Sequence, residues 1–440
     1  MNSHINRWAW AVALAGFLFG FDTVVISGAN LPTKELWGLG DWSHGFFIMS
    51  MALWGTVIGS LLGSIPCDKL GRKPTLFIIA LLYLVSALGS AFAMDPYSFS
   101  AFRFLGGLGV GASTVAVPMY IAEIAPAASR GRLVARYQFL LVLGILLAFF
   151  SNYLLDGFGG ANDWRYMLGA EAIPALILPL VLMGVPESPR WLILAKGKLT
   201  EAKEILAKAG VEDIDAEVAS IEADHYDEVK KGGTGLFSGN HNTALILAFL
   251  VAFFNQLSGI NFVLYYAPQL FEKAKLATDA ALGSSIALGV VNLVFTYVGL
   301  YLIDRIGRKG LMYIGSIGYI LTLGMTAYAF YADLSPFIIV ASLSAFIGAH
   351  AIGQGAVIWV FISEIFPNDV RAAGASWGTG THWVFAALIT LVGPTVIEAT
   401  SDVPWIVFAG FAGFMVLQLL FVAFMMPETK GKTLEQIGES

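Results

Sequence analysis

The sequence is dominated by apolar runs of roughly 20 residues, each bounded by charged residues or turn formers. A helix of this length spans the hydrocarbon core of a bilayer. Only 13% of the residues are charged and 57% are hydrophobic, whereas about 25% of a soluble domain is charged. The sequence therefore predicts an all-α membrane protein and excludes a disordered chain, because so much apolar surface must be buried.

Twelve such runs can be counted, six on either side of a polar, helix-forming segment. We expect the spans near 8–29, 45–66, 74–94, 97–122, 133–155 and 166–185, then near 243–271, 281–303, 310–331, 336–364, 372–397 and 404–426. The first run is longer than the core of a signal peptide, so we interpret it as a membrane helix. The predicted units are two six-helix halves at 1–189 and 241–427, a cytoplasmic helical linker at 190–240, and a cytoplasmic tail at 428–440.

The Lys and Arg residues are distributed unevenly between the two sides of these spans. Of the 25, 20 fall on one side and four on the other, while Arg103 lies within a span. The positive-inside rule places the richer side, with both termini, in the cytoplasm. A net charge of −6 argues against a nucleic-acid partner, and Cys67 is the single cysteine, which excludes an internal disulfide. No Cys and His cluster has metal-site spacing, and we expect no cofactor.

Three motifs occur twice, in the same order and at nearly the same offset of 236 to 241 residues. They are GSIPCDKLGRK at 63–73 and GLYLIDRIGRK at 299–309, a Glu–Arg pair seven residues apart at 123 and 130 and again at 364 and 371, and PESPR at 186–190 with PETKG at 427–431. The repetition predicts two parallel, pseudo-symmetric halves. One group of secondary transporters is built in this way, with its substrate site between the halves at mid-membrane.

The motifs resemble those of the sugar porter family of the major facilitator superfamily (MFS), over essentially the whole chain. They are GFLFGFDTVVISGA, the two D-x-x-G-R-K loops, RFLGGLGVG, YIAEIAP, PESPRWL, NQLSGINFVLYYAP, SEIFP and PETKG. The D-x-x-G-R-K loops indicate the superfamily, whereas PESPRWL, PETKG and the GIN…YY segment are specific to sugar porters. The resemblance implies an MFS fold and alternating access, and it is strongest to bacterial proton-coupled monosaccharide symporters of the xylose or glucose type.

Three ionisable residues lie inside the predicted spans, where a charge is costly and by default functional: Asp22, Arg103 and Glu171. A carboxylate that faces an arginine in a water-accessible core can change protonation as its surroundings change. The resemblance implies that all three belong to a proton-coupling site, because coupled members have an acid at the position of Asp22 and facilitators commonly have an amide. The alternative is a permanent ion pair between Asp22 and Arg103, with Glu171 merely hydrogen-bonded.

A sugar site needs neutral amides for hydroxyl groups and an aromatic surface for the C–H face of the ring. Gln256, Asn261 and Tyr265 are spaced so that they can share one face of a helix over 243–271. The resemblance implies substrate-binding roles for these three and for Gln138, Asn292, Gly355, Trp359 and Trp383, with Phe19 and Tyr266 as lid residues. The alternatives are helix-to-helix hydrogen bonding for the amides and interface anchoring for the aromatic residues.

The sequence departs from the family pattern at three positions. Asn255 stands where a second glutamine is usual, His382 stands where the family has Gln or Asn, and Ala356 replaces the proline expected after Gly355. An imidazole can still hydrogen-bond a hydroxyl group, but it titrates near neutral pH. We include Asn255 and His382 in the substrate-binding set, and we expect the departures to affect which sugar is bound and how easily the tenth span gates.

The duplicated motifs also predict a cytoplasmic gate made of charged pairs. Its members are Asp68, Arg72, Glu123, Arg130, Glu187 and Arg190 in the first half, and Asp304, Arg308, Glu364, Arg371 and Glu428 in the second. The resemblance implies that such pairs hold the inner ends of the halves together in the outward-open state. Isolated surface pairs contribute little, but a network can bias a two-state equilibrium. The alternative is ordinary positive-inside residues with incidental partners.

Together these features predict a proton-coupled monosaccharide symporter of the inner (plasma) membrane, with sugar, proton and lipid bilayer as its partners and a monomer as its functional state. A facilitative uniporter with Asp22 as a structural residue is the nearest alternative. A transporter-like sugar sensor would usually carry a long cytoplasmic tail, and about 14 residues follow Met426. We find no nucleophile–base pair or phosphate-binding loop, so we expect no enzyme and no catalytic residue. The sequence leaves open which sugar is carried.

Overall fold

The structure is a computed structural model of the 440-residue chain that describes residues 2–126, 130–231, 235–239, 241–367 and 370–430. All of its regular elements are helices. In the first half they are α1 (Ser3–Leu36), α2 (Asp41–His44), the π-helix η1 (Gly45–Met49), α3 (Met51–Leu62), α4 (Ser64–Leu70), α5 (Arg72–Phe92), α6 (Pro96–Ile124), α7 (Arg130–Leu155), the 3₁₀ turn η2 (Gly160–Asn162), α8 (Asp163–Gly169) and α9 (Ala172–Leu182). The polar segment forms α10 (Pro189–Lys196), α11 (Leu199–Ala209) and α12 (Ile214–Lys231). The second half has α13 (Asn242–Leu257), α14 (Ile260–Lys273), α15 (Thr278–Ile306), α16 (Arg308–Tyr331), α17 (Pro336–Ile352), α18 (Gln354–Glu364), α19 (Arg371–Ala399) and α20 (Trp405–Phe424).

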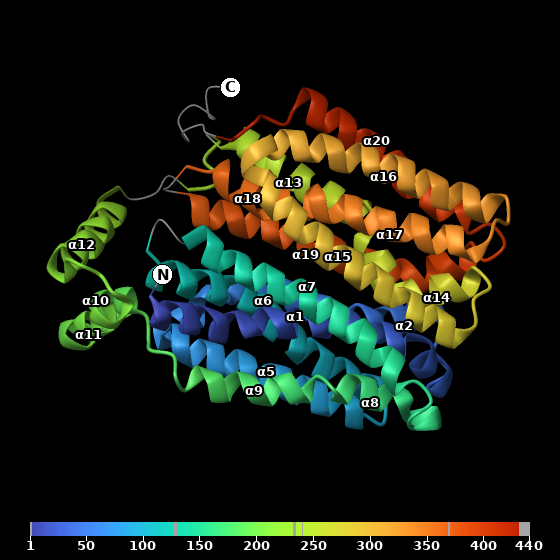
Figure 1. The fold of residues 1–440 in the computed structure, drawn as a ribbon, viewed down its shortest axis with the longest axis horizontal. Coiled ribbons are helices and arrows are strands. Elements are labelled where there is room, and N and C mark those ends of the chain that lie inside the picture. The colour runs from blue at the N-terminus through green and yellow to red at the C-terminus, as the bar shows by residue number, and fades with distance from the viewer. Residues whose placement is uncertain (1, 127–129, 232–234, 240, 368–369, 431–440) are drawn as a thin grey trace.

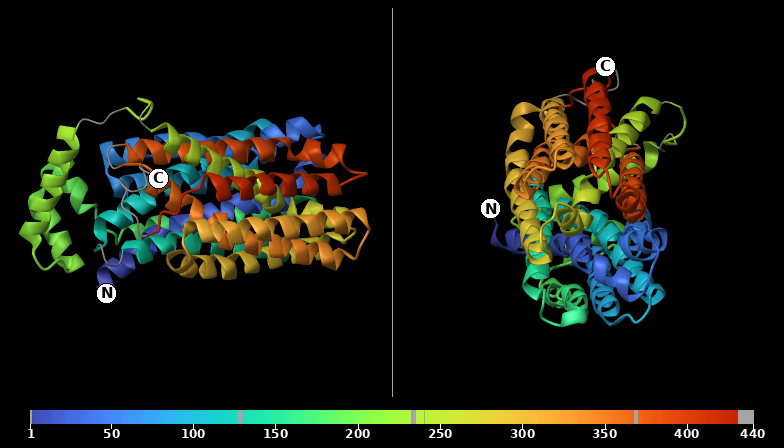
Figure 2. Two further views of the ribbon diagram at one scale, coloured as in Figure 1. Left: turned by 90° about the horizontal axis from the view of Figure 1, so that it is seen from above. Right: turned by 90° about the vertical axis from the view of Figure 1, so that its right-hand side faces the viewer.

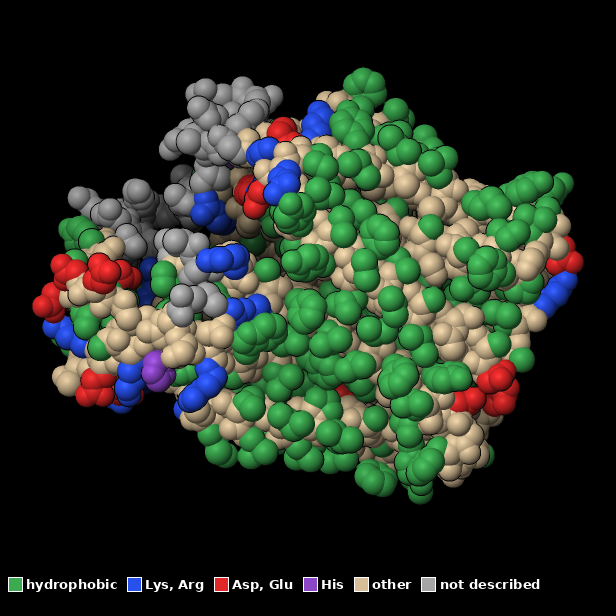
Figure 3. Space-filling view, viewed as in Figure 1, with side chains coloured by type: hydrophobic (Ala, Val, Ile, Leu, Met, Phe, Trp, Pro, Cys, Tyr) green, Lys and Arg blue, Asp and Glu red, His purple; other side chains and the backbone are tan. Residues whose placement is uncertain are grey.

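The described helices provide eleven segments that are long and apolar enough to cross a membrane. The remaining predicted span, near 45–66, is bent, because Asp41–Met49 and Met51–Leu62 meet at 42°. Figure 3 shows a face of the molecule that is covered with hydrophobic side chains along the bundle and nearly free of charged residues there, with Lys, Arg, Asp and Glu gathered toward its two ends. Side chains such as Leu81 on α5, Leu180 on α9 and Leu321 on α16 are more than half exposed on this surface. An apolar belt of this kind matches a lipid environment rather than water.

The helices form two bundles, α1 to α9 and α13 to α20, that lie side by side with their long axes roughly parallel (Figures 1 and 2). Helices α10 to α12 project beyond one end, and both ends of the described chain lie at that same end (Figure 1). The halves meet where α7 packs against α15, α1 against α14, and α19 against α2, η1 and α3. Residues from both halves can therefore line a common central site.

Two predicted continuous spans are each broken into two helices. Between α13 and α14, Gly259 has φ 85°, a left-handed conformation that only glycine adopts without strain. Between α17 and α18, Gly353 has φ −84° and ψ −101°, outside the helical region, so the tenth span breaks without a proline at Ala356. The prediction that Gln256, Asn261 and Tyr265 lie on one continuous helix is therefore wrong, since Gln256 lies in the last turn of α13 and the other two lie on α14.

Candidate functional site

Asp22 on α1 and Arg103 on α6 form an ion pair in the interior of the first half. Arg103 Nη1 lies 2.5 Å from Asp22 Oδ1, and Nη2 donates a hydrogen bond of 3.0 Å to the backbone oxygen of Asp22. Each residue is only 1% exposed. Removing one partner of a buried pair leaves an uncompensated charge, so the charges of these two residues are strongly interdependent.

Glu171 lies at the start of α9, is fully buried, and has Asp22 and Arg103 as its charged neighbours. Neither of its carboxyl oxygens has a hydrogen-bond partner among the described residues. An ionised carboxylate without hydrogen bonds is costly to bury. The structure therefore brings together the three ionisable residues that the sequence placed within spans.

In the second half, His382 connects an amide to two indole rings. Its Nε2 lies 3.1 Å from Nε2 of Gln256, and its ring stands 4.8 Å from the rings of both Trp359 and Trp383. The Trp383 ring also contacts Phe19 of the first half, at 5.6 Å between centroids. These five residues form a cluster at the contact between α1 and the second half.

Two polar atoms in this cluster are buried without a protein partner among the described residues: Oε1 of Gln256, which can only accept, and Nε1 of Trp383, which can only donate. Leaving such an atom unpaired costs free energy, so both are suited to meet a ligand. A sugar hydroxyl can serve either atom, because it both donates and accepts.

The other predicted substrate residues lie on several helices of both halves. Tyr265 is 1% exposed, Asn261 and Asn292 are 8% exposed, and Asn292 accepts a hydrogen bond of 3.4 Å from Thr296. Gln138 on α7 is half-buried. The space at Gly355 is limited, because a Cβ there would lie 3.1 Å from the backbone oxygen of His350. Tyr266, the second lid candidate, is fully buried and donates to the backbone oxygen of Thr390 at 2.6 Å.

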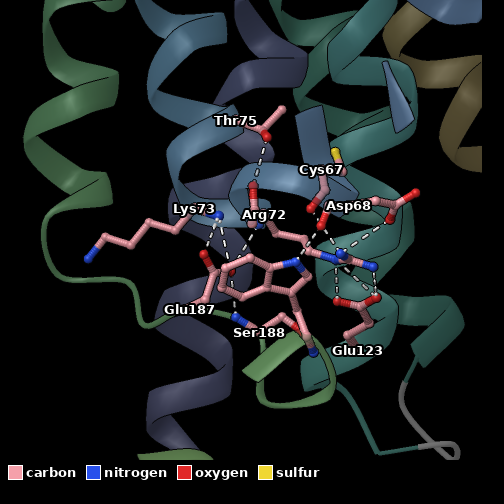
Figure 4. A network of polar contacts seen from close by, with 10 residues as sticks. Cys67, Asp68, Arg72, Lys73, Thr75, Glu123, Glu187 and Ser188 are labelled. Carbon is pink, nitrogen blue, oxygen red and sulfur yellow. Dashed lines mark hydrogen bonds and ion pairs between the residues drawn. The ribbon is translucent and has the colours of Figure 1, made fainter. Parts of the chain in front are cut away.

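At the end of the bundle near α10, Arg72 organises a network of polar contacts that we call the first-half cluster: Arg72, Glu123, Asp68 and Glu187 (Figure 4). Its guanidinium group binds Glu123 through two N–H groups, at 2.8 and 2.9 Å, and approaches Asp68 at 3.4 Å. Glu187 accepts hydrogen bonds from the backbone N–H groups of Arg72 and Lys73, at 3.0 and 3.1 Å. Burial raises the pKa of the Glu187 carboxyl, although these hydrogen bonds act to lower it.

The second half repeats this arrangement in the second-half cluster: Arg308, Glu364, Asp304 and Glu428. Arg308 lies 2.7 Å from Glu364 and 3.2 Å from Asp304, and Glu428 accepts from the backbone N–H of Arg308 at 3.0 Å. Gly71 and Gly307 precede the arginines with φ 107° and 91°. A Cβ at either position would lie 2.3 to 2.5 Å from the carboxylate of Glu187 or Glu428, so glycine is required for this close approach.

Each cluster joins helices of its own half. The side chain of Arg130, the predicted partner of Glu123, lies outside the described residues. Arg371 donates to the backbone oxygen of Phe366 at 3.4 Å, and Arg190 lies near the start of α10. In this conformation, the ion pairs of the two clusters do not cross between the halves.

The profile of the family described as "Sugar (and other) transporter" matches residues 8–440. The chain belongs to this sugar transporter family. Its members are transporters and not enzymes. The predicted family and the predicted all-α, multi-pass membrane fold are both confirmed.

Individual relatives match nearly the whole length of the sugar transporter. The arabinose-proton symporter of Bacillus subtilis is 36% identical over 97% of this chain and 93% of its own length. The xylose transporter XylE from E. coli, in a partially occluded inward open conformation, superimposes with a TM-score of 0.87 at 32% identity, over 98% of this chain and all of the other. The proton:xylose symporter XylE bound to 6-bromo-6-deoxy-D-glucose gives a TM-score of 0.83 at 33% identity, with 99% of each chain covered.

At the end of the sugar transporter opposite α10, a hydrogen bond that the sequence did not predict joins the halves. Asn30 on α1 donates to Oε1 of Gln269 on α14 at 2.9 Å, and its own Oδ1 lies 2.8 Å from Nε2 of the buried His44. Asn30 and Gln269 also line a cavity of about 650 Å³ between the ends of α1, α8, α14 and α15. The signal in the sequence was weak, because each is a lone amide at or just beyond the end of a predicted span. The position of the bond suits a latch that closes this end.

Replacing Asn30 by alanine should shift the conformational equilibrium of the sugar transporter toward a form open at this end. A net hydrogen bond contributes about 0.5–1.5 kcal/mol, so we expect a shift of about 2- to 13-fold in the ratio of conformers. Spin labels at Ala161 and Thr278, which are exposed and line the cavity, would report it as longer distances in a Cys67→Ala background.

Thr33→Val is the matched control for this variant, because the Thr33 hydroxyl is buried on the same helix and, among the described residues, bonds only to backbone oxygens of α1. It should leave the distance distribution unchanged. Equal distributions in Asn30→Ala and the parent protein would exclude the latch.

Proposed function

We propose that the protein is a proton-coupled monosaccharide symporter that works by alternating access. The observation that carries this proposal is the buried Asp22–Arg103 pair, with the unpartnered carboxyl of Glu171 beside it. Burying three ionisable groups in a membrane core costs free energy that a passive sugar carrier does not need. The relatives reported above that are named for arabinose-proton and proton:xylose symport support the same assignment.

The sugar site in this proposal is the cluster of Gln256, His382, Trp359, Trp383 and Phe19. Its buried acceptor and its buried donor are matched by hydroxyl groups, and its indole rings offer an apolar surface for the C–H face of a pyranose. Phe19 belongs to the first half and the other four residues belong to the second. A sugar bound here would contact both halves and could therefore favour one relative arrangement of them over another.

The coupling step would be a change of protonation at the Asp22–Arg103 pair. When Asp22 is ionised it holds the Arg103 guanidinium group, and when it accepts a proton the ion pair is lost and Arg103 can turn toward another acceptor. Glu171 is the neighbouring carboxyl that is placed to receive it. Since Asp22 lies on α1 three residues from Phe19, a movement at the proton site is transmitted directly to the sugar cluster.

We further propose that the protein lies in the inner (plasma) membrane as a monomer, with both termini and α10 to α12 in the cytoplasm. The 20 Lys and Arg residues that sequence topology places on one side support this orientation. The proton is the coupling ion, and the transport cycle uses no other cofactor. A proton that moves inward gains about 2.3 kcal/mol per 100 mV of membrane potential.

Uptake by proteoliposomes tests the function. We expect at least one of D-xylose, L-arabinose, D-glucose and D-galactose to accumulate when a pH gradient, acidic outside, is imposed. Collapsing the gradient with a protonophore should abolish accumulation but not equilibration. Sugar uptake that equilibrates equally fast with and without the gradient, and never exceeds the outside concentration, would identify a facilitative uniporter instead. The absence of uptake of all four sugars would refute a monosaccharide carrier of this kind.

A further inference from the structure

A chain of buried polar side chains leads from the sugar cluster into the second half. It begins at Gln256 on α13 and passes through its neighbour Asn255 to α18, α20 and α16. All of its members are 2% exposed or less. The successive hydrogen bonds are Gln256 Nε2 to Asn255 Oδ1 at 3.1 Å, Asn255 Nδ2 to Gln354 Oε1 at 3.3 Å, Gln354 Nε2 to Gln418 Oε1 at 2.9 Å, and Gln418 Nε2 to Ser316 Oγ at 2.8 Å.

The chain ends on backbone oxygens, and these fix its direction. Ser316 donates to the backbone oxygen of Met312 at 2.7 Å, and Gln354 Nε2 also donates to that of Val251 at 3.4 Å. A carbonyl oxygen can only accept, so Ser316 must use its proton there and can only accept from Gln418. Each amide must then present its oxygen toward the sugar cluster and its NH₂ group away from it.

At the near end, this direction determines what Gln256 can offer. One of its N–H groups is used by Asn255, and the other faces His382 at 3.1 Å. Both donors are thus occupied within the protein, while Oε1 is buried and unpartnered. Turning the Gln256 amide over would point its NH₂ group to the side that Oε1 now faces. It would also bring two acceptors, the Gln256 oxygen and Asn255 Oδ1, against each other.

We infer that Gln354, Gln418 and Ser316 are positioning residues that hold Gln256 as a hydrogen-bond acceptor, so that the site selects a sugar hydroxyl that donates to it. This inference rests on the proposed function. Gln354 is the central residue, because it joins Asn255 to both carbonyl ends of the chain and because the helix break at Gly353 makes it the first residue of α18. An amide that is free to turn over could bind either a hydrogen-bond donor or a hydrogen-bond acceptor of the ligand.

Deoxyfluoro sugars test the inference, because fluorine replaces a hydroxyl group in size but cannot donate a hydrogen bond. The probe is whichever of D-xylose, L-arabinose, D-glucose and D-galactose the wild type binds most tightly, with its set of singly fluorinated analogues. For one position of the ring, wild-type affinity should fall by at least about tenfold on fluorination. In Gln354→Met, whose side chain has similar length and no hydrogen-bond polarity, this fluorine penalty should fall below about threefold.

A milder variant covers the case in which Gln354→Met does not fold. Ser316→Ala removes only the hydroxyl at the far end of the chain and should give an intermediate penalty, whereas Ser316→Thr keeps a hydroxyl there and should restore the full penalty. Ser342→Ala is the matched control, since Ser342 is also buried, bonds to Thr326 of α16 at 2.8 Å, and in the described part of the protein has no hydrogen bond to Gln354, Gln418 or Ser316. It should leave the fluorine penalty at its wild-type value.

The ratio of the affinities for the sugar and for its fluorinated analogue separates a positioning role from a general loss of stability. A loosened fold weakens the binding of both ligands alike. A wild-type penalty that is unchanged in both Gln354→Met and Ser316→Ala would overturn the inference while leaving the symporter proposal in place. A wild type that discriminates against fluorine at no position would also overturn it. If the wild type binds none of the four sugars, the proposed function itself is refuted.

Discussion

Replacing Asp22 by asparagine is expected to abolish accumulation of sugar against its gradient while sugar binding and counterflow stay measurable. Asparagine keeps the shape of the side chain and can still accept from Arg103, but it cannot take up a proton. With a pH gradient of one unit, worth about 1.4 kcal/mol per proton, the wild type should concentrate sugar up to about tenfold at one proton per sugar. The variant should stop at equal concentrations inside and outside, as measured by uptake of labelled sugar into proteoliposomes.

Two further variants show whether this effect is specific to the buried pair. Glu171→Gln should lower accumulation less than Asp22→Asn, because Glu171 adjusts the Asp22–Arg103 pair from beside it. Asp95→Asn removes a carboxylate of the same charge from the exposed cap of α6, where it accepts from the backbone N–H groups of Tyr97 and Ser98, and it should leave accumulation unchanged. If Asp22→Asn still concentrates sugar, Asp22 is a structural partner of Arg103 and not the coupling site.

Truncating Gln256 or Trp383 to alanine should weaken sugar binding by about 5- to 150-fold. Each variant removes a polar atom that is buried without a protein partner, and loss of a buried hydrogen bond costs about 1–3 kcal/mol. Trp383→Ala also removes the ring that Phe19 contacts from the other half. Isothermal titration calorimetry in detergent would measure the affinity, and thermal unfolding would establish that each variant is folded.

Trp377→Ala is the matched control, because Trp377 lies on the same helix but contacts Phe237 and donates to the backbone oxygen of Leu245. It should change sugar affinity less than twofold. A change of less than twofold in both Gln256→Ala and Trp383→Ala would mean that sugar binds elsewhere in the protein.

The parts of the fold that follow from length and repetition could be predicted from the sequence. Spans of about 20 apolar residues have one solution in lipid, since a helix satisfies its own backbone hydrogen bonds. The duplicated motifs predicted a similar set of charged residues in each half, but they did not predict that Arg72 contacts Glu123 and that Arg308 contacts Glu364, because the spacing within the motifs paired these two acids with Arg130 and Arg371. The ionisable residues Asp22 and Arg103 were identifiable because a charge inside an apolar run is rare.

Other features could not be predicted because they depend on tertiary contacts. The breaks at Gly259 and Gly353 involve ordinary glycines in a sequence that has 48 of them. Gln354 and Gln418 are lone amides 64 residues apart, and the packing of α18 and α20 against α13 and α16 brings them within 2.9 Å. Asn30 and Gln269 are 239 residues apart and belong to different halves.

The two arginine clusters have a mechanical consequence. Each ties together the ends of several helices within a single half, so a half can rock as a unit without breaking an ion pair of its own cluster. The difference in free energy between the inward-open and outward-open forms then depends on the contacts between the halves, where α7 packs against α15, α1 against α14, and α19 against α3. Moving such an equilibrium from 1:99 to 99:1 takes about 5.5 kcal/mol. A ligand shifts this equilibrium only by the difference between its affinities for the two forms, so the sugar and the proton would together have to bind one form about 10⁴-fold more tightly than the other.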